Sequence, residues 1–175
     1  MKTLKVGIVG CGGIANGKHL PAIRNNGHFE AVAFCDLVEE RAVKAKEEYG
    51  TADAHVYTDY RELLKEDLDA VYVLTPNNAH APVTIEALRA GKHVMCEKPM
   101  AKTYAEAKAM VEAAKETGKI LTIGYQNRYR GDSQYLKRAC ENDDLGEIYY
   151  AKAHAVRRRA VPTWGVFLDE EKQGG

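Results

Sequence analysis

The sequence has few cysteines, no net charge and no long apolar run, and each of these shortages excludes a class of protein. Its cysteines, Cys11, Cys35, Cys96 and Cys140, include no Cys-x-x-Cys pair, which argues against a zinc site and a disulfide framework. Basic and acidic residues number 25 each, and no long basic run suggests a nucleic-acid partner. No apolar stretch approaches the roughly 20 residues of a membrane span. We therefore expect a reduced, cytoplasmic protein with no metal, nucleic-acid or membrane partner.

What the sequence does contain is a regular alternation of apolar strands and amphipathic helices. Strands are predicted over 3–9, 29–35, 55–57, 70–74, 93–96 and 120–124. Helices are predicted over 12–25 (interrupted only by Pro21), 38–49, 60–64, 81–90 and 104–117. Near-continuous apolar strands between such helices are typical of a parallel sheet that is covered on both faces. Right-handed crossovers then give a doubly wound α/β domain over residues 1–124.

The pattern changes after Gly124. A helix is predicted over 133–141 and a strand over 147–156, but the remaining residues offer that strand no partner. A single strand cannot form a sheet, so residues 125–175 are interpreted as the incomplete beginning of an α+β substrate and oligomerisation domain. An unpaired strand edge of this length favours pairing with another copy, and we expect a homo-oligomer.

The first predicted strand runs directly into a glycine-rich turn and then a helix, an order typical of Rossmann dinucleotide-binding folds. Gly10 permits the tight turn, Gly12 allows close approach of a pyrophosphate, and the small Ala15 lets the helix pack on the strand. The phosphates would then face free N–H groups at a helix N-terminus. The alternative is a merely structural turn. The cofactor contacts predicted here are Gly10, Cys11, Gly12, Gly13 and Ile14.

Asp36 follows the second strand, where a carboxylate can accept hydrogen bonds from a ribose 2′-hydroxyl. The next residues are Leu37 and Val38 rather than arginine, so a 2′-phosphate would meet a carboxylate without a compensating cation. This favours NAD over NADP as the cofactor. Arg41, one turn later, keeps NADP open.

A polar turn follows the strand over 70–74. Pro76 ends the strand, and Asn78 is predicted to cap the next helix. The functional interpretation places this turn against the ribose and nicotinamide of the cofactor; the alternative is an ordinary loop, in which a first-turn histidine has a structural role. The candidate cofactor contacts are Thr75, Pro76, Asn77 and His80.

Glu97-Lys98-Pro99 follows the strand over 93–96. Burial would lower the pKa of Lys98, and Glu97 would raise it. In either case the ammonium group could donate a hydrogen bond to a substrate oxygen as charge develops during hydride transfer. The alternative is a surface ion pair at the end of the sheet. After the last strand, Gln126 lies in a segment that brings amide and aromatic groups to the same edge.

Taken together, the glycine turn and the segments 75–80, 97–99 and 124–128 resemble the Gfo/Idh/MocA family of dehydrogenases. The resemblance implies hydride transfer between NAD(P) and a sugar, polyol or related small hydroxy compound. It also implies that Lys98 orients the substrate hydroxyl and the nicotinamide, and that Glu97 contacts the cofactor. The resemblance further implies a cis Lys98–Pro99 peptide bond, since the family commonly has it so and X-Pro is the one bond where cis is inexpensive.

The sequence departs from the family pattern at its end. Members continue for a comparable length into an open-faced sheet domain, which supplies an Asp and a His downstream of a Gly-Gly; here Gly174-Gly175 are the last residues. No residue of this chain is assigned that proton-transfer role, and we expect negligible turnover from the chain alone. Two other functions stay open, an NAD-sensing module without chemistry and an S-adenosylmethionine-dependent methyltransferase. Glu97-Lys98-Pro99 and the sixth parallel strand argue against the methyltransferase.

Overall fold

The computed structural model describes residues 2–156, 158–159, 162–163 and 165–174. The chain divides into two compact units. The first contains Met1–Gly124 together with Val166–Gly175, and the second contains Tyr125–Gly165. The end of the chain therefore packs with the first unit, although the sequence predicted a single division at residue 124.

The first unit contains a six-stranded sheet in the order β3-β2-β1-β4-β5-β6. Each pair of neighbouring strands is parallel, which confirms the doubly wound α/β fold. The parallel pairing of β5 with β6 is one of the two features that argue against a methyltransferase. The strands are β1 Leu4–Val9, β2 Phe29–Cys35, β3 His55–Tyr57, β4 Ala70–Val73, β5 His93–Cys96 and β6 Leu121–Ile123.

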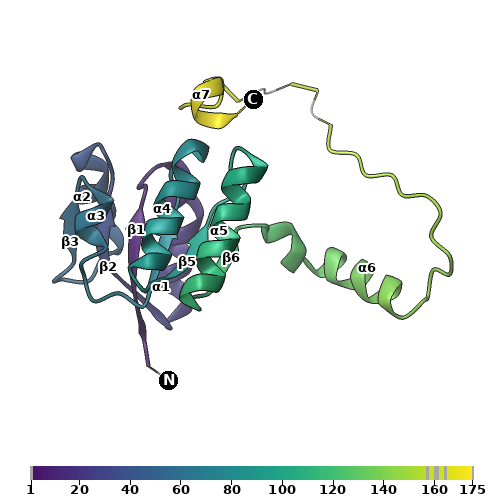
Figure 1. The fold of residues 1–175 in the computed structure, drawn as a ribbon, viewed down its shortest axis with the longest axis horizontal. Helices are drawn as coiled ribbons and strands as arrows, with labels where there is room; N and C mark the ends of the chain where they lie inside the picture. Colours follow the sequence, from purple (N-terminus) through teal and green to yellow (C-terminus); the bar gives the residue numbers. More distant parts are fainter. Residues whose placement is uncertain (1, 157, 160–161, 164, 175) are drawn as a thin grey trace. The chain divides into compact units, whose positions relative to one another are not determined.

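Helices cover both faces of this sheet and enclose two apolar cores (Figure 1). One core joins strand residues such as Ile8 and Phe34 to the helical elements η1, α1 and α2. The other joins strand residues such as Val71 and Val73 to α3, α4 and α5. Strands buried on both sides are the reason that these segments are nearly continuously apolar. The bounds are η1 Ala15–His19, α1 Leu20–Asn26, α2 Glu39–Tyr49, α3 Tyr60–Leu63, α4 Asn77–Arg89 and α5 Tyr104–Thr117.

The helix that follows β1 differs from the single helix predicted over 12–25. It opens with the π-helical turn η1 and continues as α1, with Pro21 at the second position of α1. Proline lacks an N–H group, and its ring clashes with the carbonyl four residues earlier in an α-helix. In the wider turn, the N–H of Leu20 instead reaches the carbonyl of Ala15, five residues back. The π turn therefore accommodates the proline.

Helix α4 begins at Asn77, four residues before the predicted start at residue 81. Pro76 occupies the N-cap position and no side chain caps the helix, so the predicted capping role of Asn78 is wrong. Pro82 lies inside the helix and cannot donate to the carbonyl of Asn78. Asn78 is exposed, so water can satisfy this carbonyl and the helix continues through the proline.

The second unit contains a short 3₁₀ turn, η2 Gln126–Tyr129, and the helix α6 Gly131–Glu141. Residues 147–156 form no strand, so the predicted strand is wrong. Its backbone finds no partner strand in the described part of the chain, and a lone strand leaves its N–H and C=O groups unpaired. Pairing of this segment with another copy stays a prediction.

The last described residues of the chain form one helical turn, α7 Glu170–Gln173, in the first unit. This turn contacts α4: the Asn77 side chain donates to the carbonyl of Gln173 over 3.0 Å. The Lys102 ammonium group donates to the carbonyl of Glu171. None of the helices in the described ranges is long and apolar enough to cross a membrane.

Candidate functional site

Gly10 makes the tight turn that the sequence predicts for it at the end of β1. Its φ is +96°, and its N–H donates to the carbonyl of Cys35 over 2.8 Å. A Cβ atom at this position would lie 2.6 Å from the carbonyl oxygen of Leu74. Only glycine fits both requirements. The turn after β1 is therefore held against the end of β4.

Gly12 and Gly13 lie over open space, because a Cβ atom added at either position meets nothing within 4 Å. This part of the turn has room for a ligand that approaches the backbone closely. The Asn16 side chain steadies the turn by donating to the carbonyls of Cys11 (2.8 Å) and Gly12 (2.9 Å). The sequence did not predict this brace. Ala15 is fully buried, as expected for helix–strand packing.

The carboxylate of Asp36 is tied directly to the glycine turn. Its Oδ2 accepts the N–H of Cys11 over 2.9 Å, and its Oδ1 accepts the N–H of Val38 over 3.0 Å. A carboxylate offers about four lone-pair directions, so each oxygen can still accept a further donor such as a ribose hydroxyl. These two hydrogen bonds therefore orient the carboxylate and leave it able to accept further hydrogen bonds.

Cys11 contributes to this turn through its backbone rather than its thiol. Burial, together with the charge of Asp36, raises the pKa of the Cys11 thiol to about 12. The side chain is buried in the core and stays a neutral thiol at physiological pH. Its N–H is used by Asp36, as described above.

The turn after β4 contains an unpaired polar atom. The hydroxyl oxygen of Thr75 is buried and has no hydrogen-bond partner among the described residues. Most buried polar atoms in proteins are paired, so an unpaired one next to an open turn is a candidate for ligand contact. The neighbouring Pro76 is exposed, and the side chain of Asn77 is half-buried and bonded to Gln173.

His80 is buried, and its ring links two loops at the carboxyl edge of the sheet. Nδ1 lies 2.7 Å from the carbonyl oxygen of Pro99, and Nε2 lies 3.0 Å from that of Thr75. Both nitrogens thus face protein carbonyls. This geometry assigns His80 the structural role that was its alternative; direct contact with a cofactor stays a prediction.

Glu97 and Lys98 follow β5 and differ sharply in exposure. Glu97 is 9% exposed, whereas the Lys98 side chain is exposed, so the expected burial of Lys98 is wrong. The Glu97 carboxylate pairs with His19 Nε2 over 2.8 Å and accepts the backbone N–H of Lys98 over 2.9 Å. The Lys98 ammonium group makes no ion pair with this carboxylate among the described residues, so the alternative of a surface ion pair at the end of the sheet is not formed here. The Lys98–Pro99 bond is cis, as the resemblance implied.

Burial raises the pKa of Glu97, but the hydrogen bonds from His19 and from the Lys98 backbone lower it by more. The pKa therefore lies below its ordinary value, and the carboxylate is ionised at neutral pH. Gly124 provides the space for this group, since a Cβ atom there would lie 3.1 Å from Glu97 Oε1. His19 is a site residue that the sequence reasoning missed.

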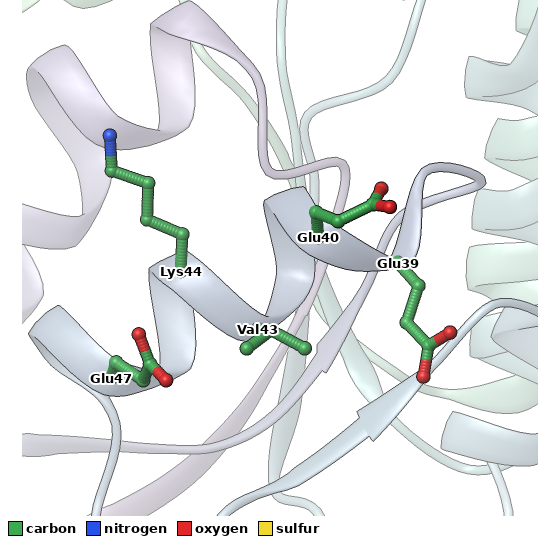
Figure 2. A pocket seen from close by; sticks show the side chains of 5 residues that line it. All are labelled: Glu39, Glu40, Val43, Lys44 and Glu47. Carbon is green, nitrogen blue, oxygen red and sulfur yellow. The ribbon is translucent and has the colours of Figure 1, made fainter.

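Gln126 belongs to the second unit, where it begins η2, and its predicted cofactor contact stays a prediction. The surface of α2 carries an open hollow lined by Glu39, Glu40, Val43, Lys44 and Glu47. Figure 2 shows that these side chains come from one helix and point away from one another. A convergent binding site needs side chains that point toward one another.

In the described part of the chain, no group of three or more side chains that could hold a metal ion lies together.

The residues at the carboxyl edge fit a dinucleotide in three respects. The glycine turn leaves open space over Gly12 and Gly13, Asp36 is oriented with free lone pairs, and the Thr75 hydroxyl lacks a partner. The strand order reverses between β1 and β4, and ligands of open α/β sheets bind at such a switch point.

The chain matches one protein-family model and resembles curated and solved proteins. The model described as "Oxidoreductase family, NAD-binding Rossmann fold" matches residues 4–125. D-glucoside 3-dehydrogenase of Escherichia coli (strain K12) is 41% identical over 173 residues, which are 98% of this chain and 49% of that protein. The chain thus spans about half the length of the curated relatives that it matches.

Solved structures agree with this similarity. The WlbA dehydrogenase from Chromobacterium violaceum, in complex with NADH and UDP-GlcNAcA, matches with a TM-score of 0.79 and 34% identity, over 85% of this chain and 43% of that one. A 3-ketoreductase from Actinomadura kijaniata, in complex with NADP and TDP-benzene, matches with a TM-score of 0.73 and 30% identity, over 81% and 43%. On the match over residues 4–125, the chain belongs to the Gfo/Idh/MocA oxidoreductase family, which has an NAD-binding Rossmann fold.

Proposed function

We propose that this chain is the cofactor-binding part of an NAD(P)-dependent dehydrogenase that acts on a sugar, a polyol or a related small hydroxy compound. The observation that carries the proposal is the open glycine turn, which is tied through Cys11 to Asp36. Family membership and the sugar-related relatives support it. The nicotinamide of a bound cofactor supplies or accepts the hydride.

The residues of this chain would bind and orient that cofactor. The backbone around Gly12 and Gly13 leaves room for the pyrophosphate at the start of the helical turns. Asp36 would accept hydrogen bonds from a ribose, and the unpaired Thr75 hydroxyl would gain a partner. We propose the same set of contacts as in the sequence prediction, namely Gly10, Cys11, Gly12, Gly13, Ile14, Asp36, Thr75, Pro76, Asn77, His80, Glu97, Lys98 and Gln126.

Lys98 is the residue of this chain that we assign to catalysis. Its exposed ammonium group can donate a hydrogen bond to a substrate oxygen, where charge develops as hydride is transferred. The ionised Glu97 beneath it holds the backbone N–H of Lys98. No residue is assigned to proton transfer, so we propose that the chain alone binds cofactor and shows negligible turnover.

We propose NAD as the preferred cofactor. Both Asp36 oxygens already accept one N–H each, so a 2′-phosphate would be placed beside a fixed negative charge. The next residue, Leu37, is 92% exposed and offers no cation. Arg41 is exposed on α2, one turn after Asp36 in the sequence, and its positive charge keeps NADP binding open.

Titration with NADH and with NADPH, followed by nicotinamide fluorescence, tests this proposal. We expect saturable binding of both, with tighter binding of NADH. Asp36→Ser retains a short oxygen-bearing side chain but removes the charge. We expect this variant to reduce the difference in affinity between NADH and NADPH. A matched control is Asp132→Ser, which removes an exposed carboxylate of the second unit and leaves both affinities unchanged. A chain that binds neither nucleotide contradicts the proposal.

Two finer points belong to the same proposal. We infer a cytoplasmic location, which the four free cysteines support. We also infer a homo-oligomer, now because the second unit exposes large apolar side chains such as Tyr149 and Leu136 that a partner surface would cover. Light scattering after size-exclusion chromatography measures the oligomeric state. A mass equal to one chain at all concentrations contradicts the oligomer.

A further inference from the structure

We propose that His19 is a positioning residue: it holds the Glu97 carboxylate and, through it, orients the backbone of Lys98. The inference rests on the proposed function of this edge of the sheet. It adds a residue from a different element, η1, to the site.

The geometry connects three segments through one carboxylate. His19 is the last residue of η1, in the helix that follows the glycine turn. Its Nε2 lies 2.8 Å from Oε1 of Glu97, and because an ionised carboxylate only accepts, Nε2 carries the shared proton. The other carboxylate oxygen, Oε2, accepts the N–H of Lys98 over 2.9 Å. A displacement of Glu97 would therefore release the backbone of Lys98.

The surroundings fix this pair in one arrangement. The side chains of His19 and Glu97 are only 15% and 11% exposed. The His19 ring packs edge-to-face against Tyr72 of β4, with ring centres 5.9 Å apart. On the other side, Gly124 leaves just enough room for the carboxylate. Poor access of water strengthens a charged hydrogen bond of this kind.

Among the described residues, His19 is one of two that lower the pKa of Glu97, and it does so first through its hydrogen bond to the carboxylate. The other is Lys98, through its backbone N–H and its charge. Cys96 lies next to Glu97, and burial raises the pKa of this thiol to about 12, so it is neutral. Tyr72, which contacts His19, also has a pKa raised by burial and is neutral. Burial raises the pKa of Glu97, and without His19 only the interactions with Lys98, among the described residues, would lower it.

The plainer alternative is that His19 only fills space between η1 and Tyr72. The two roles predict different results for a phenylalanine at this position. Phenylalanine keeps an aromatic ring against Tyr72 but cannot donate to Glu97. Glutamine keeps an N–H donor and loses the ring. The pair of variants therefore separates packing from positioning.

The test is a carboxyl ¹³C NMR titration of Glu97 in the chain as it stands, with Glu97→Gln to assign the signal. In His19→Phe we expect the pKa of Glu97 to rise by about 1 unit or more, and in His19→Gln by less. NADH binding, measured by fluorescence, is expected to weaken about tenfold in His19→Phe, equivalent to one hydrogen bond of ordinary net strength. Partial recovery is expected in His19→Gln.

His55→Phe is the matched control, because His55 pairs with Glu66 over 2.7 Å at the exposed edge of the same sheet. It should leave both the pKa of Glu97 and the NADH affinity unchanged. An unchanged pKa of Glu97 in His19→Phe overturns the inference, as does a full shift in His19→Gln with no recovery of binding. If His19→Phe does not fold, the titration of His19→Gln tests the inference instead: a small rise in the pKa of Glu97 supports it, and an unchanged pKa overturns it. Failure of the unaltered chain to bind NADH would instead contradict the proposed function, while the Glu97 titration still tests the His19 link.

Discussion

The two units of this chain contain similar kinds of residues but bury them to very different degrees. In the first unit, strands and helices enclose two apolar cores, and residues such as Phe34 and Leu63 are fully buried. In the second unit, Ala139 is the one buried apolar residue among those described, while Tyr149 is 95% exposed. A sheet offers two faces that helices can cover, whereas one helix and an extended segment provide no second layer to enclose a core. The stability of the chain is therefore expected to come from the first unit.

The largest difference between the units should appear when one buried and one exposed aromatic ring are truncated. Phe34→Ala is expected to lower the free energy of unfolding by about 3–5 kcal/mol, because it leaves a cavity in the core. Tyr149→Ala should change it by less than about 0.5 kcal/mol. Urea denaturation followed by circular dichroism measures both. Equal losses would show that the second unit is packed as tightly as the first.

Within the first unit, two glycines of one turn should separate stability from binding. Gly10→Ala places a Cβ atom 2.6 Å from a carbonyl oxygen at a φ of +96°, and we expect a loss of more than about 1 kcal/mol of unfolding free energy. Gly12→Ala meets no atom, so stability should stay within about 0.5 kcal/mol. Its NADH affinity should fall, because the methyl group occupies the space left for the pyrophosphate. Unchanged NADH binding in Gly12→Ala would argue that the turn is only structural.

The reactivity of the cysteines in the unaltered chain should also differ between the well-buried first unit and the exposed second unit. Burial raises the pKa values of Cys11, Cys35 and Cys96 in the first unit to about 12, so almost no thiolate exists there at pH 8. Cys140 in the second unit is exposed. We expect one thiol per chain to react rapidly with a disulfide reagent in the native state, and all four after denaturation. Rapid reaction of a second thiol would mean that a core of the first unit opens readily.

The smallest expected difference is between the contributions of two carboxylates, Glu97 and Asp132, to the free energy of unfolding at low pH. The pKa of Glu97 lies below its ordinary value of 4.5, so its stabilising contribution is complete above pH 4.5 and is lost as the pH falls below it. The difference in unfolding free energy between the unaltered chain and Glu97→Gln should therefore shrink in that range. Asp132, in the second unit, also has a lowered pKa, caused by Arg130, but it is exposed. About 1 M salt should remove any contribution of Asp132 and leave most of that of Glu97. Equal salt sensitivity would place Glu97 in contact with water.

The parts of the molecule that could be predicted from the sequence are those that depend on local pattern. The six strands are apolar because both faces of the sheet are covered, and their bounds were nearly correct. Gly10 was identifiable because a glycine between a strand and a helix indicates a special backbone conformation. Asp36 was placed by its position after the second strand. In each case the signal lies within a few residues of the feature.

The parts that were missed depend on residues far apart in the sequence or on irregular turns. His19 pairs with a residue 78 positions later, and no pattern in the residues around it indicates that partner. The start of α4 was obscured by Pro82, which the helix tolerates at a position where Asn78, the residue that loses its hydrogen-bond donor, is exposed to water. In the strand predicted over 147–156, apolar and polar residues alternate only in part, and the segment has no partner strand in the described part of the chain; partial alternation alone does not make a strand.

The link between the Cys11 N–H and Asp36 constrains any attempt to redesign cofactor preference. Replacing Asp36 to admit a 2′-phosphate also removes the acceptor that anchors the glycine turn. A charge-free substitution that keeps an oxygen atom within reach of Cys11 preserves the anchor, whereas an alanine leaves a backbone donor unpaired. In this protein, a change of nucleotide preference at position 36 therefore has to keep an acceptor for the Cys11 N–H.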